Sequence, residues 1–426
     1  MRKIFGLFVV LAVVLTVNAF AGGSSESSSS SSAAKSVSIW GWRTQDAPLW
    51  KEVNARLAKM GDNVTINYES FVPTEYDSKA LVALQGGTGP DIMYTRRLPG
   101  QRTQALIDGN YIVSLTGKVD LTNFTEQTLN SLSSGGKAWG IPFANQVVGI
   151  FYNKDIFAKY NLAIPKTWND LVTVAKTLKS NGETPFFISG KAGWTLAMQN
   201  AMVGVSLPGE TWIKEVIDGK TTFTSPQYVD LLTKLNDLKA YYQKDFLANS
   251  TDDMDAAFAF GKAAMVFYGI WGGTNWKKLN PDFNYGFFPV PPENANQPAA
   301  VYVYMDGGYG LNAASKNQDA ALKVLKYTAT KEFGTLFSQT TGELTAVKGA
   351  TIPDNNPIGQ LAYKDSTTIG AKYIYWVGSP FENGTPTVYS ILQNDMQSMY
   401  IGNMTPTQLA QKIQDGVATW YPAFKK

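Results

Sequence analysis

Short runs of alternating hydrophobic and polar residues are separated along the chain by stretches with helical spacing. Residues 37–40 and 64–68 alternate and 91–94 form a short apolar run, so each predicts a strand. The stretches 46–60 and 74–84 between them have apolar residues at helical spacing, with Asp46 as the expected N-cap of the first helix. This β-α-β-α-β order predicts a mainly parallel sheet covered by helices, the α/β class.

The same rhythm continues through the rest of the chain. Thr167 begins a helix with Asp170 three residues later, Ser225 is expected to cap a longer helix with Pro226 at its first position, and Thr405 opens a final helix. Further strands are predicted at 185–188, 263–268 and 285–290. No internal repeat of 20 to 50 residues is visible, which argues against a solenoid or a propeller.

The N-terminal residues have the pattern of an export signal. Arg2 and Lys3 precede an apolar run of 14 residues at 4–17, and Ala19-Phe20-Ala21 matches a cleavage site before Gly22. The run is shorter than the ~20 residues of a membrane-spanning helix. We therefore expect a signal peptide at 1–21, followed by a Ser-rich flexible linker at 22–36.

Composition removes several classes of chemistry. The 426 residues, enough for two or three domains, contain no Cys and no His, which excludes thiol nucleophiles, disulfides, Ser-His triads and His or thiolate metal sites. Without the predicted signal peptide there are 35 basic and 34 acidic side chains, so nothing in the charge favours nucleic acid. Since no Cys is present to carry a lipid, we expect a periplasmic or extracellular protein without a lipid anchor.

Six short segments of the sequence are distinctive when taken together. They are 84–92 (LQGGTGPDI), 136–143 (GKAWGIPF), 149–155 (GIFYNKD), 165–171 (PKTWNDL), 260–271 (FGKAAM and GIW) and 307–310 (GGYG). In these segments and in their order the chain resembles the bacterial extracellular solute-binding proteins of family 1, the class that includes maltose-binding protein. Asp170 stands where that family usually has Glu.

The resemblance implies a two-lobed periplasmic-binding-protein fold, in which each lobe is a mainly parallel sheet flanked by helices and the ligand cleft lies at the hinge. The chain is expected to cross between the lobes near 142–148, 302–307 and 339–347. The N-terminal lobe would then contain residues 37–144 and 304–345, and the C-terminal lobe residues 145–303 and 346–426. The implied function is the substrate-binding component of a sugar ABC importer, with a carbohydrate and permease subunits as partners. Neither catalysis, a cofactor, a metal nor nucleic acid is expected, and we expect a monomer.

Residues at predicted strand ends are candidates for a sugar site. A sugar offers C–H faces to aromatic rings and hydroxyls to planar polar side chains, and the carboxyl ends of parallel strands line the crevice of an open sheet. Trp42 and Arg43 follow the first strand, and Arg96 and Arg97 follow the strand at 91–94. The alternatives are a core position for Trp42 and a solvated surface pair for the arginines.

Other candidates follow from the resemblance and from neighbouring glycines. Trp271 matches a residue that the family commonly stacks on sugar, and Asn145 falls in the first expected crossing. Asp306 and Gly307 lie at the return crossing, where glycine allows a ligand to approach the backbone. The remaining candidates are Tyr76, Trp194, Glu343 and Trp376. Four other tryptophans are expected to pack in the core: Trp50, Trp139, Trp168 and Trp420.

Two other functions fit parts of the sequence. A secreted glycosidase needs only two carboxylates, for which Asp306, Glu343 and Glu382 are candidates, but their spacing singles out no pair. The transport fold with a polyamine, a phosphate ester or a metal as cargo is the second alternative. The near-neutral charge and the number of tryptophans favour a sugar, while the paired arginines leave an acidic or phosphorylated sugar open.

Overall fold

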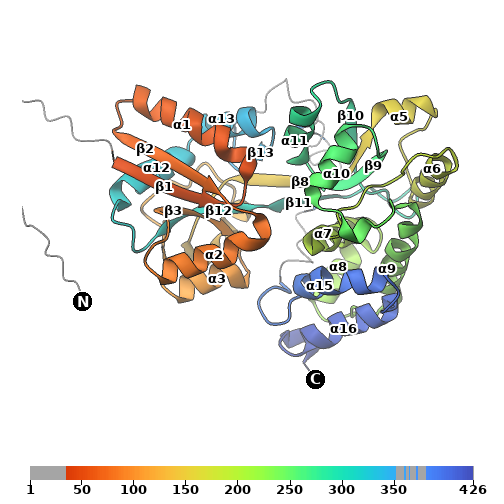
Figure 1. The fold of residues 1–426 in the computed structure, drawn as a ribbon. Coiled ribbons are helices and arrows are strands. Elements are labelled where there is room, and N and C mark those ends of the chain that lie inside the picture. The colour runs from red at the N-terminus through yellow and green to blue at the C-terminus, as the bar shows by residue number, and fades with distance from the viewer. Residues whose placement is uncertain (1–34, 352–358, 361–363, 365–370, 373–379, 426) are drawn as a thin grey trace, which may run out of the picture. The chain divides into compact units, whose positions relative to one another are not determined.

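Two mixed β-sheets flanked by helices make up the described part of the chain (Figure 1). The computed structural model describes residues 35–351, 359–360, 364, 371–372 and 380–425. The strands are β1 (Lys35–Gly41), β2 (Val64–Ser70), β3 (Ile92–Arg96), β4 (Ile112–Val113), β5 (Ser133–Ser134), β6 (Lys137–Ala138), β7 (Ile141–Pro142), β8 (Ala144–Asn153), β9 (Met265–Gly269), β10 (Tyr285–Phe288), β11 (Val301–Met305), β12 (Gly307–Asn312), β13 (Leu344–Thr345) and β14 (Ala371–Lys372).

The helices between these strands account for most of the remaining described chain. They are α1 (Ala47–Lys59), α2 (Pro73–Gln85), α3 (Gln101–Asp108), α4 (Glu126–Asn130), α5 (Lys154–Lys159), α6 (Trp168–Ser180), α7 (Gly193–Ser206), α8 (Gly209–Ile217), α9 (Pro226–Leu238), α10 (Thr251–Ala259), α11 (Gly272–Leu279), α12 (Gln318–Thr328), α13 (Lys331–Thr341), α15 (Val388–Tyr400) and α16 (Pro406–Ala418).

The first sheet contains the strands expected from the start of the chain. Its order is β2-β1-β3-β12-β4, and β7 also pairs with β12. β1 runs parallel to both β2 and β3, which confirms the predicted β-α-β-α-β unit, while β12 is antiparallel to β3. Figure 1 shows α1 and α13 along one face of this sheet and α2 and α3 along the other. The carboxyl ends of β1 and β3 therefore lie side by side, which brings residues 42–43 and 96–97 to one edge.

The second sheet corrects the expectation that both sheets are mainly parallel. Its order is β10-β8-β11-β14, with β9 and β13 also paired to β8. The long strand β8 is antiparallel to β9, β10, β11 and β13, and β11 and β14 form a parallel pair. β8 enters this sheet directly from the first one, so it runs against the strands that follow. The α/β class is confirmed, but strand direction could not be read from the order of elements alone.

The chain passes between the two sheets within two of the three ranges expected for crossings, 142–148 and 302–307. β7 belongs to the first sheet and β8 to the second, and the chain returns from β11 to β12. In the third range, 339–347, β13 pairs with β8, but Ala346 and Val347 directly after it still pack in the core beside the first sheet. Residues at these passages therefore lie next to both sheets.

Each sheet has its own hydrophobic core. Ile39, Trp50 and Tyr309 are among the buried side chains beside the first sheet, and Phe151 and Trp276 are among those beside the second. Burying such side chains contributes about 1.5–3 kcal/mol each relative to exposure. Of the four tryptophans expected to pack, Trp50 and Trp168 are buried, whereas Trp139 and Trp420 are half-buried with their indole N–H groups bonded to backbone carbonyls.

Several local expectations need correction. Lys35 and Ser36, placed in the flexible linker, already belong to β1. Asp46 does not cap α1, because its carboxylate binds Arg43 instead, and Ser225 accepts a hydrogen bond from Trp212 rather than capping α9. The strand expected at 185–188 is reduced to an isolated bridge at Phe186.

Two predicted helix starts are confirmed. The hydroxyls of Thr167 and Thr405 accept hydrogen bonds from the backbone N–H groups of Asp170 and Gln408, whose side chains bond back in turn. The signal peptide predicted at 1–21 lies outside the described residues and stays a prediction.

Candidate functional site

A cavity of about 1160 Å³ lies between side chains of the first sheet and helices that pack on the second. One wall is built from residues between 42 and 106, among them residues that directly follow β1, belong to β3 or lie on the helices α2 and α3. The other wall is built from residues 191–275, from β11 and from residues 382–393. Both walls contain residues that the sequence singled out.

Aromatic rings form a continuous surface on the second wall. The ring centroids of Trp194 and Trp271 are 6.3 Å apart, and Tyr268 lies 5.0 Å and Tyr304 6.5 Å from Trp271. Both tryptophans are half-buried, so part of each indole faces the cavity. Gly269 explains the placement of Trp271, because a Cβ at position 269 would collide with the indole ring.

Arginines dominate the first wall. The guanidinium carbon of Arg96 lies 3.6 Å from the centroid of the Trp42 ring, and its Nε donates to both carboxylate oxygens of Asp77 at 3.0 and 3.2 Å. Arg102 binds the same carboxylate at 3.1 Å. Burial opposes ionisation of Asp77, but the two arginines hold the pKa of this carboxyl below its usual range.

A second group of contacts joins the two walls. Arg97 lies 3.9 Å from the carboxylate of Glu382 and 5.2 Å from the centroid of the Tyr304 ring. Glu382 is 7% exposed, and its Oε1 accepts no hydrogen bond from the described residues. Burial raises the pKa of Glu382 above its ordinary value, although Arg97 and Arg102 oppose this. Nearby, the Gln101 side-chain amide donates to the Thr385 hydroxyl at 2.6 Å.

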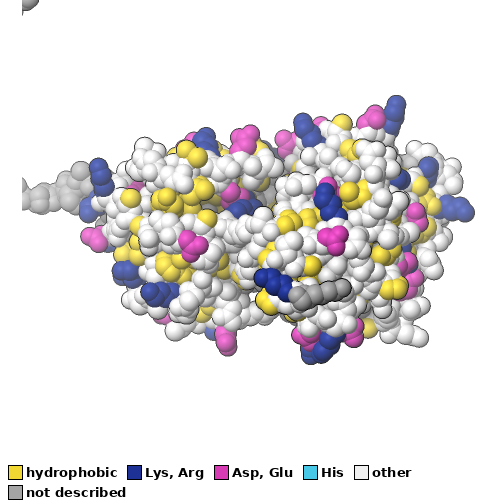
Figure 2. Space-filling view, turned by 90° about the horizontal axis from the view of Figure 1, so that it is seen from below, with side chains coloured by type: hydrophobic (Ala, Val, Ile, Leu, Met, Phe, Trp, Pro, Cys, Tyr) yellow, Lys and Arg dark blue, Asp and Glu magenta, His cyan; other side chains and the backbone are white. Residues whose placement is uncertain are grey.

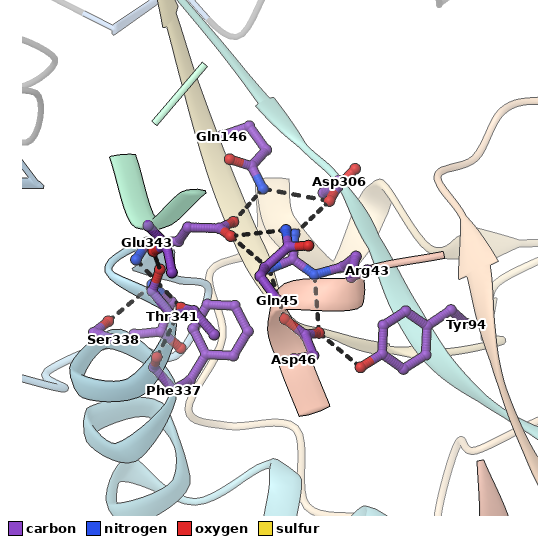
Figure 3. A network of polar contacts seen from close by, with 12 residues as sticks. Arg43, Gln45, Asp46, Tyr94, Gln146, Asp306, Phe337, Ser338, Thr341 and Glu343 are labelled. Atoms are coloured by element: carbon purple, nitrogen blue, oxygen red, sulfur yellow. Dashed lines mark hydrogen bonds and ion pairs between the residues drawn. The ribbon is translucent and has the colours of Figure 1, made fainter. Parts of the chain in front are cut away.

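Arg43 is the centre of a buried polar cluster at the passages between the sheets (Figure 3). Its Nε and Nη2 donate to Asp46 at 2.9 and 3.0 Å, its Nη1 to Asp306 at 2.8 Å, and its Nη2 also to Glu343 at 2.8 Å. Gln146 donates to both Asp306 and Glu343. The hydroxyl of Tyr94 donates to Asp46 at 2.7 Å. Three carboxylates therefore surround one guanidinium.

Burial and the neighbouring charges shift the pKa values of Arg43 and Glu343. Arg43 is 2% and Glu343 0% exposed. Burial raises the pKa of the Glu343 carboxyl, and the charges of Asp46 and Asp306 add to this, while Arg43 and Gln146 oppose it. The Arg43 guanidinium would lose its proton more readily on burial alone, but the three carboxylates raise its pKa. The cluster holds more acidic than basic groups, and in this setting Glu343 takes up a proton more easily than an exposed glutamate does.

Most of the sequence candidates border the cavity. Those among its lining residues are Trp42, Arg43, Tyr76, Arg96, Arg97, Trp194, Trp271 and Asp306. Asn145, Gly307 and Glu343 are absent from this lining, and Trp376 lies outside the described residues. Arg43 borders the cavity with its three nitrogens already directed at carboxylates, and the Tyr76 hydroxyl lies 2.8 Å from the carbonyl oxygen of Tyr94.

Several other cavity residues could not be selected from sequence patterns. Asp255 on α10 is 4% exposed and accepts hydrogen bonds from Asn275 and from the indole N–H of Trp276. Burial raises the pKa of Asp255 to about 7, despite these two bonds. In the sequence it is one of three acidic residues at the start of a helix, which is an ordinary helix-start pattern. The alternation of 301–304 could have indicated Tyr304, which faces the cavity from β11.

Charges around the cavity balance. The basic lining residues are Arg43, Arg96, Arg97, Arg102 and Lys191, and the acidic ones are Asp77, Asp252, Asp255, Asp306 and Glu382. On the face shown in Figure 2, basic and acidic side chains are likewise interspersed. Within the described ranges, no three acidic side chains are arranged to hold a metal ion, and no helix is long and apolar enough to cross a membrane.

Solved structures with the same fold bind sugars. The chitin oligosaccharide binding protein superimposes with a TM-score of 0.76 at 22% identity, covering 90% of this chain and 98% of that one. The maltose/maltodextrin-binding domain MalE from Bdellovibrio bacteriovorus, bound to maltotriose, gives a TM-score of 0.71 at 21% identity, covering 90% and 99%. At these identities the likeness shows the fold, an α/β architecture like that of MalE.

Sequence comparison identifies the family. The chain is 26% identical over 348 residues to the multiple sugar-binding protein of Streptococcus mutans, covering 77% of this chain and 80% of the relative. The profile of the bacterial extracellular solute-binding proteins matches residues 40–334. These proteins act outside the cytoplasm, bind solutes without catalysis and serve ABC transporters, here of a sugar-transporting group. The glycosidase alternative is thereby excluded, and the chain belongs to the bacterial extracellular solute-binding protein family.

Proposed function

We propose that this protein binds a neutral oligosaccharide in the cavity between the two sheets and delivers it to the permease subunits of an ABC importer. The observation that carries the proposal is that the two cavity walls present different kinds of side chain. Aromatic faces from Trp194 and Trp271 lie on one side, and side chains that bind hydroxyls lie on the other. Sugars are recognised by this combination of surfaces.

Cavity size favours an oligosaccharide over a single sugar. Pockets for drug-sized ligands are typically about 300–1,000 Å³, and this cavity is about 1160 Å³. The ring surface extends from Trp194 through Trp271 to Tyr304, so it offers more than one ring face. Relatives of known ligand include structures bound to maltotriose and to raffinose.

The charge balance favours a neutral ligand over an acidic or phosphorylated one. Each arginine of the first wall has an acidic neighbour: Asp77 lies beside Arg96 and Arg102, and Glu382 lies beside Arg97. A carboxylate or phosphate entering here would be repelled by Asp77 and Glu382, whereas a hydroxyl can donate to a carboxylate and accept from an arginine.

We further propose that the two lobes close over the ligand. The division at 37–144 plus 304–345 and 145–303 plus 346–426 is supported by the passages between the sheets near residues 143, 306 and 343. Ala346 and Val347 pack in the core of the first sheet, so the third boundary is better drawn a few residues later. Closure couples ligand contacts on both walls to a state that a permease can distinguish.

The proposed ligand contacts are the candidates with side chains on the cavity surface. Trp194, Trp271 and Arg97 retain this role, together with Arg96 and Asp306. Arg43 and Glu343 are proposed to support Asp306 from behind, since their polar atoms are engaged within the buried cluster. We also propose that the protein works as an exported monomer.

A thermal-shift screen tests the proposal. The panel contains maltotriose, raffinose, lactose, chitin oligosaccharides and galactose, with spermidine, inorganic phosphate and galacturonic acid as controls of other chemistry. A neutral sugar present at 100 times its Kd should stabilise the protein by ~2.7 kcal/mol and raise its Tm. Isothermal titration calorimetry then gives Kd for each hit.

The outcome of the screen decides between ligand classes. Stabilisation by neutral oligosaccharides, with little effect of the controls, supports the proposal. Stabilisation by spermidine or phosphate alone would contradict the sugar assignment, and stabilisation by galacturonic acid in preference to galactose would contradict the neutrality of the ligand.

A further inference from the structure

Trp42 was selected from the sequence as a surface for sugar stacking, but its ring is covered. The guanidinium of Arg96 lies over it at 3.6 Å from the ring centroid. The rings of Tyr76, Tyr94 and Phe143 also pack against the indole, with their centroids 5.3, 5.5 and 5.9 Å from that of Trp42. The residue is 7% exposed. Little of the indole surface is therefore left for a ligand.

Arg96 is held in this position from two directions. Its Nε donates to both oxygens of Asp77, and its Nη2 donates to the carbonyl of Pro73 at 3.3 Å. Nη1 makes none of these contacts, and the Arg96 side chain is 15% exposed where it lines the cavity. A guanidinium fixed on one face and along one edge presents its remaining N–H groups in a defined direction.

The aromatic residues on the opposite wall are arranged differently. Trp194 and Trp271 are half-buried, and within the described part of the chain no Lys or Arg side chain lies over either ring. Their faces are accessible to the C–H groups of a sugar, while the ring of Trp42 carries a cation. The two walls are therefore suited to contact different parts of a ligand.

Resting on the proposed sugar-binding function, we infer that Trp42 is a positioning residue for Arg96, and that Arg96 is the residue of this wall that donates hydrogen bonds to sugar hydroxyls. Arg96 sets specificity at this end of the cavity, together with the nearby Asp306 carboxylate, which can accept from a neighbouring hydroxyl. The preferred ligand carries adjacent hydroxyl groups on the edge that faces the first wall, and its C–H face meets Trp194 and Trp271.

A double-mutant cycle separates this role from direct stacking. Kd for the tightest-binding sugar of the panel is measured by calorimetry for the wild type, Trp42→Phe, Arg96→Met and the double variant. We expect Arg96→Met to weaken binding about 10- to 100-fold, the loss typical of a charge-assisted hydrogen bond. Trp42→Phe should weaken binding less, and it should add nothing once Arg96 is replaced.

Two further variants control the interpretation. Arg96→Lys keeps the charge but loses the planar stack and the paired bonds to Asp77, so it should restore little of the affinity. Trp168→Phe makes the same change as Trp42→Phe at a buried site outside the cavity lining and should leave Kd unchanged. Melting curves of all variants establish that each is folded.

The possible results are distinct. If Trp42→Phe weakens binding by the same factor with and without Arg96, then Trp42 contacts the sugar itself and the inference is overturned, while the proposed function stands. Full affinity in Arg96→Lys or Arg96→Met also overturns it. If no sugar binds the wild type, both the proposed function and this inference fail.

Discussion

Glu343→Gln is expected to leave the free energy of unfolding within about 1 kcal/mol of wild type at pH 7, whereas Arg43→Met is expected to lower it by about 3–5 kcal/mol. Both residues are almost completely buried, and they share an ion pair of 2.8 Å. A count of ion pairs would predict similar losses. The difference arises because three carboxylates share one guanidinium.

The magnitude follows from the charges of the cluster. At an effective dielectric constant of about 20, opposite charges about 4 Å apart attract by ~4 kcal/mol, and like charges about 6 Å apart repel by ~3 kcal/mol. Ionised Glu343 gains one such attraction, to Arg43, and suffers two repulsions, from Asp46 and Asp306. Removing its charge therefore relieves roughly 2 kcal/mol, which offsets one or two weakened hydrogen bonds of about 1 kcal/mol each.

Gln146 makes the glutamine variant easier to accommodate. Its buried Oε1 accepts no hydrogen bond from the described residues, while its amide nitrogen donates to Glu343. A rotation of the Gln146 amide allows this oxygen to accept from a glutamine at position 343. Arg43→Met has no such remedy, because it leaves Asp46, Asp306 and Glu343 without their shared cation.

The contribution of Glu343 to the free energy of unfolding should fall as pH rises. The folded-state pKa of Glu343 is raised above its ordinary value of 4.5. Folded Glu343 therefore holds its proton over a range in which the unfolded chain has released it, and its contribution to stability is lost as pH rises from about 4.5 through the folded pKa. Glu343→Gln does not titrate, so its stability relative to wild type should improve across this range.

Urea denaturation at several pH values between 4 and 8 measures both effects, with tryptophan fluorescence as the probe and m-values to check that the transition is unchanged. Glu343→Ala serves as the matched control, because it removes the charge and also leaves a cavity and takes away one of the two carboxylates that accept from the Gln146 amide; it should cost about 2–4 kcal/mol. Equal losses for Glu343→Gln and Arg43→Met, or a stability difference from wild type that does not change with pH, would refute the reasoning.

Three further predictions concern the cavity and one helix start. Trp271→Ala should weaken sugar binding by about 1–4 kcal/mol without preventing folding, and an unchanged Kd in calorimetry would remove this residue from the site. Asp255→Asn should remove a loss of stability that wild type shows as pH rises from about 4 to about 7, since burial raises the Asp255 pKa to about 7; denaturation curves of both proteins across this range measure the difference, and an equal pH dependence in both would contradict the prediction. Thr405→Ala should lower the free energy of unfolding by about 1 kcal/mol through loss of the cap of α16, and a change below 0.3 kcal/mol would contradict this assignment.

Local sequence patterns predicted those helices and strands that depend on interactions between residues close in sequence. Thr167 and Thr405 mark helix starts through bonds to residues three positions away, and the β1-α1-β2-α2-β3 unit follows from alternating and helical spacing. The direction of β8 depends on partners more than a hundred residues distant, such as β9 and β11, and no local pattern encodes it.

Local patterns likewise indicated some of the residues that line the cavity, and their roles as ligand contacts stay predictions. Strand ends and glycines indicated Trp42, Arg96 and Trp271, and all three border the cavity. What each of these side chains can contact depends on its neighbours in the tertiary structure, and many of these are distant in sequence. Asp77 comes from α2 to hold Arg96 over Trp42, and the Arg43 side chain turns toward carboxylates that are distant in sequence.

The equal number of basic and acidic groups around the cavity has a consequence for ligand uptake outside the cell. A binding site with a strong field gains encounter rate at low ionic strength and loses it when salt is added. For the uncharged sugar proposed above, a site with equal numbers of basic and acidic groups should show neither this gain nor this loss. Uptake by this protein should therefore proceed at nearly the same speed in fresh and in saline surroundings, with solute abundance and diffusion setting the rate.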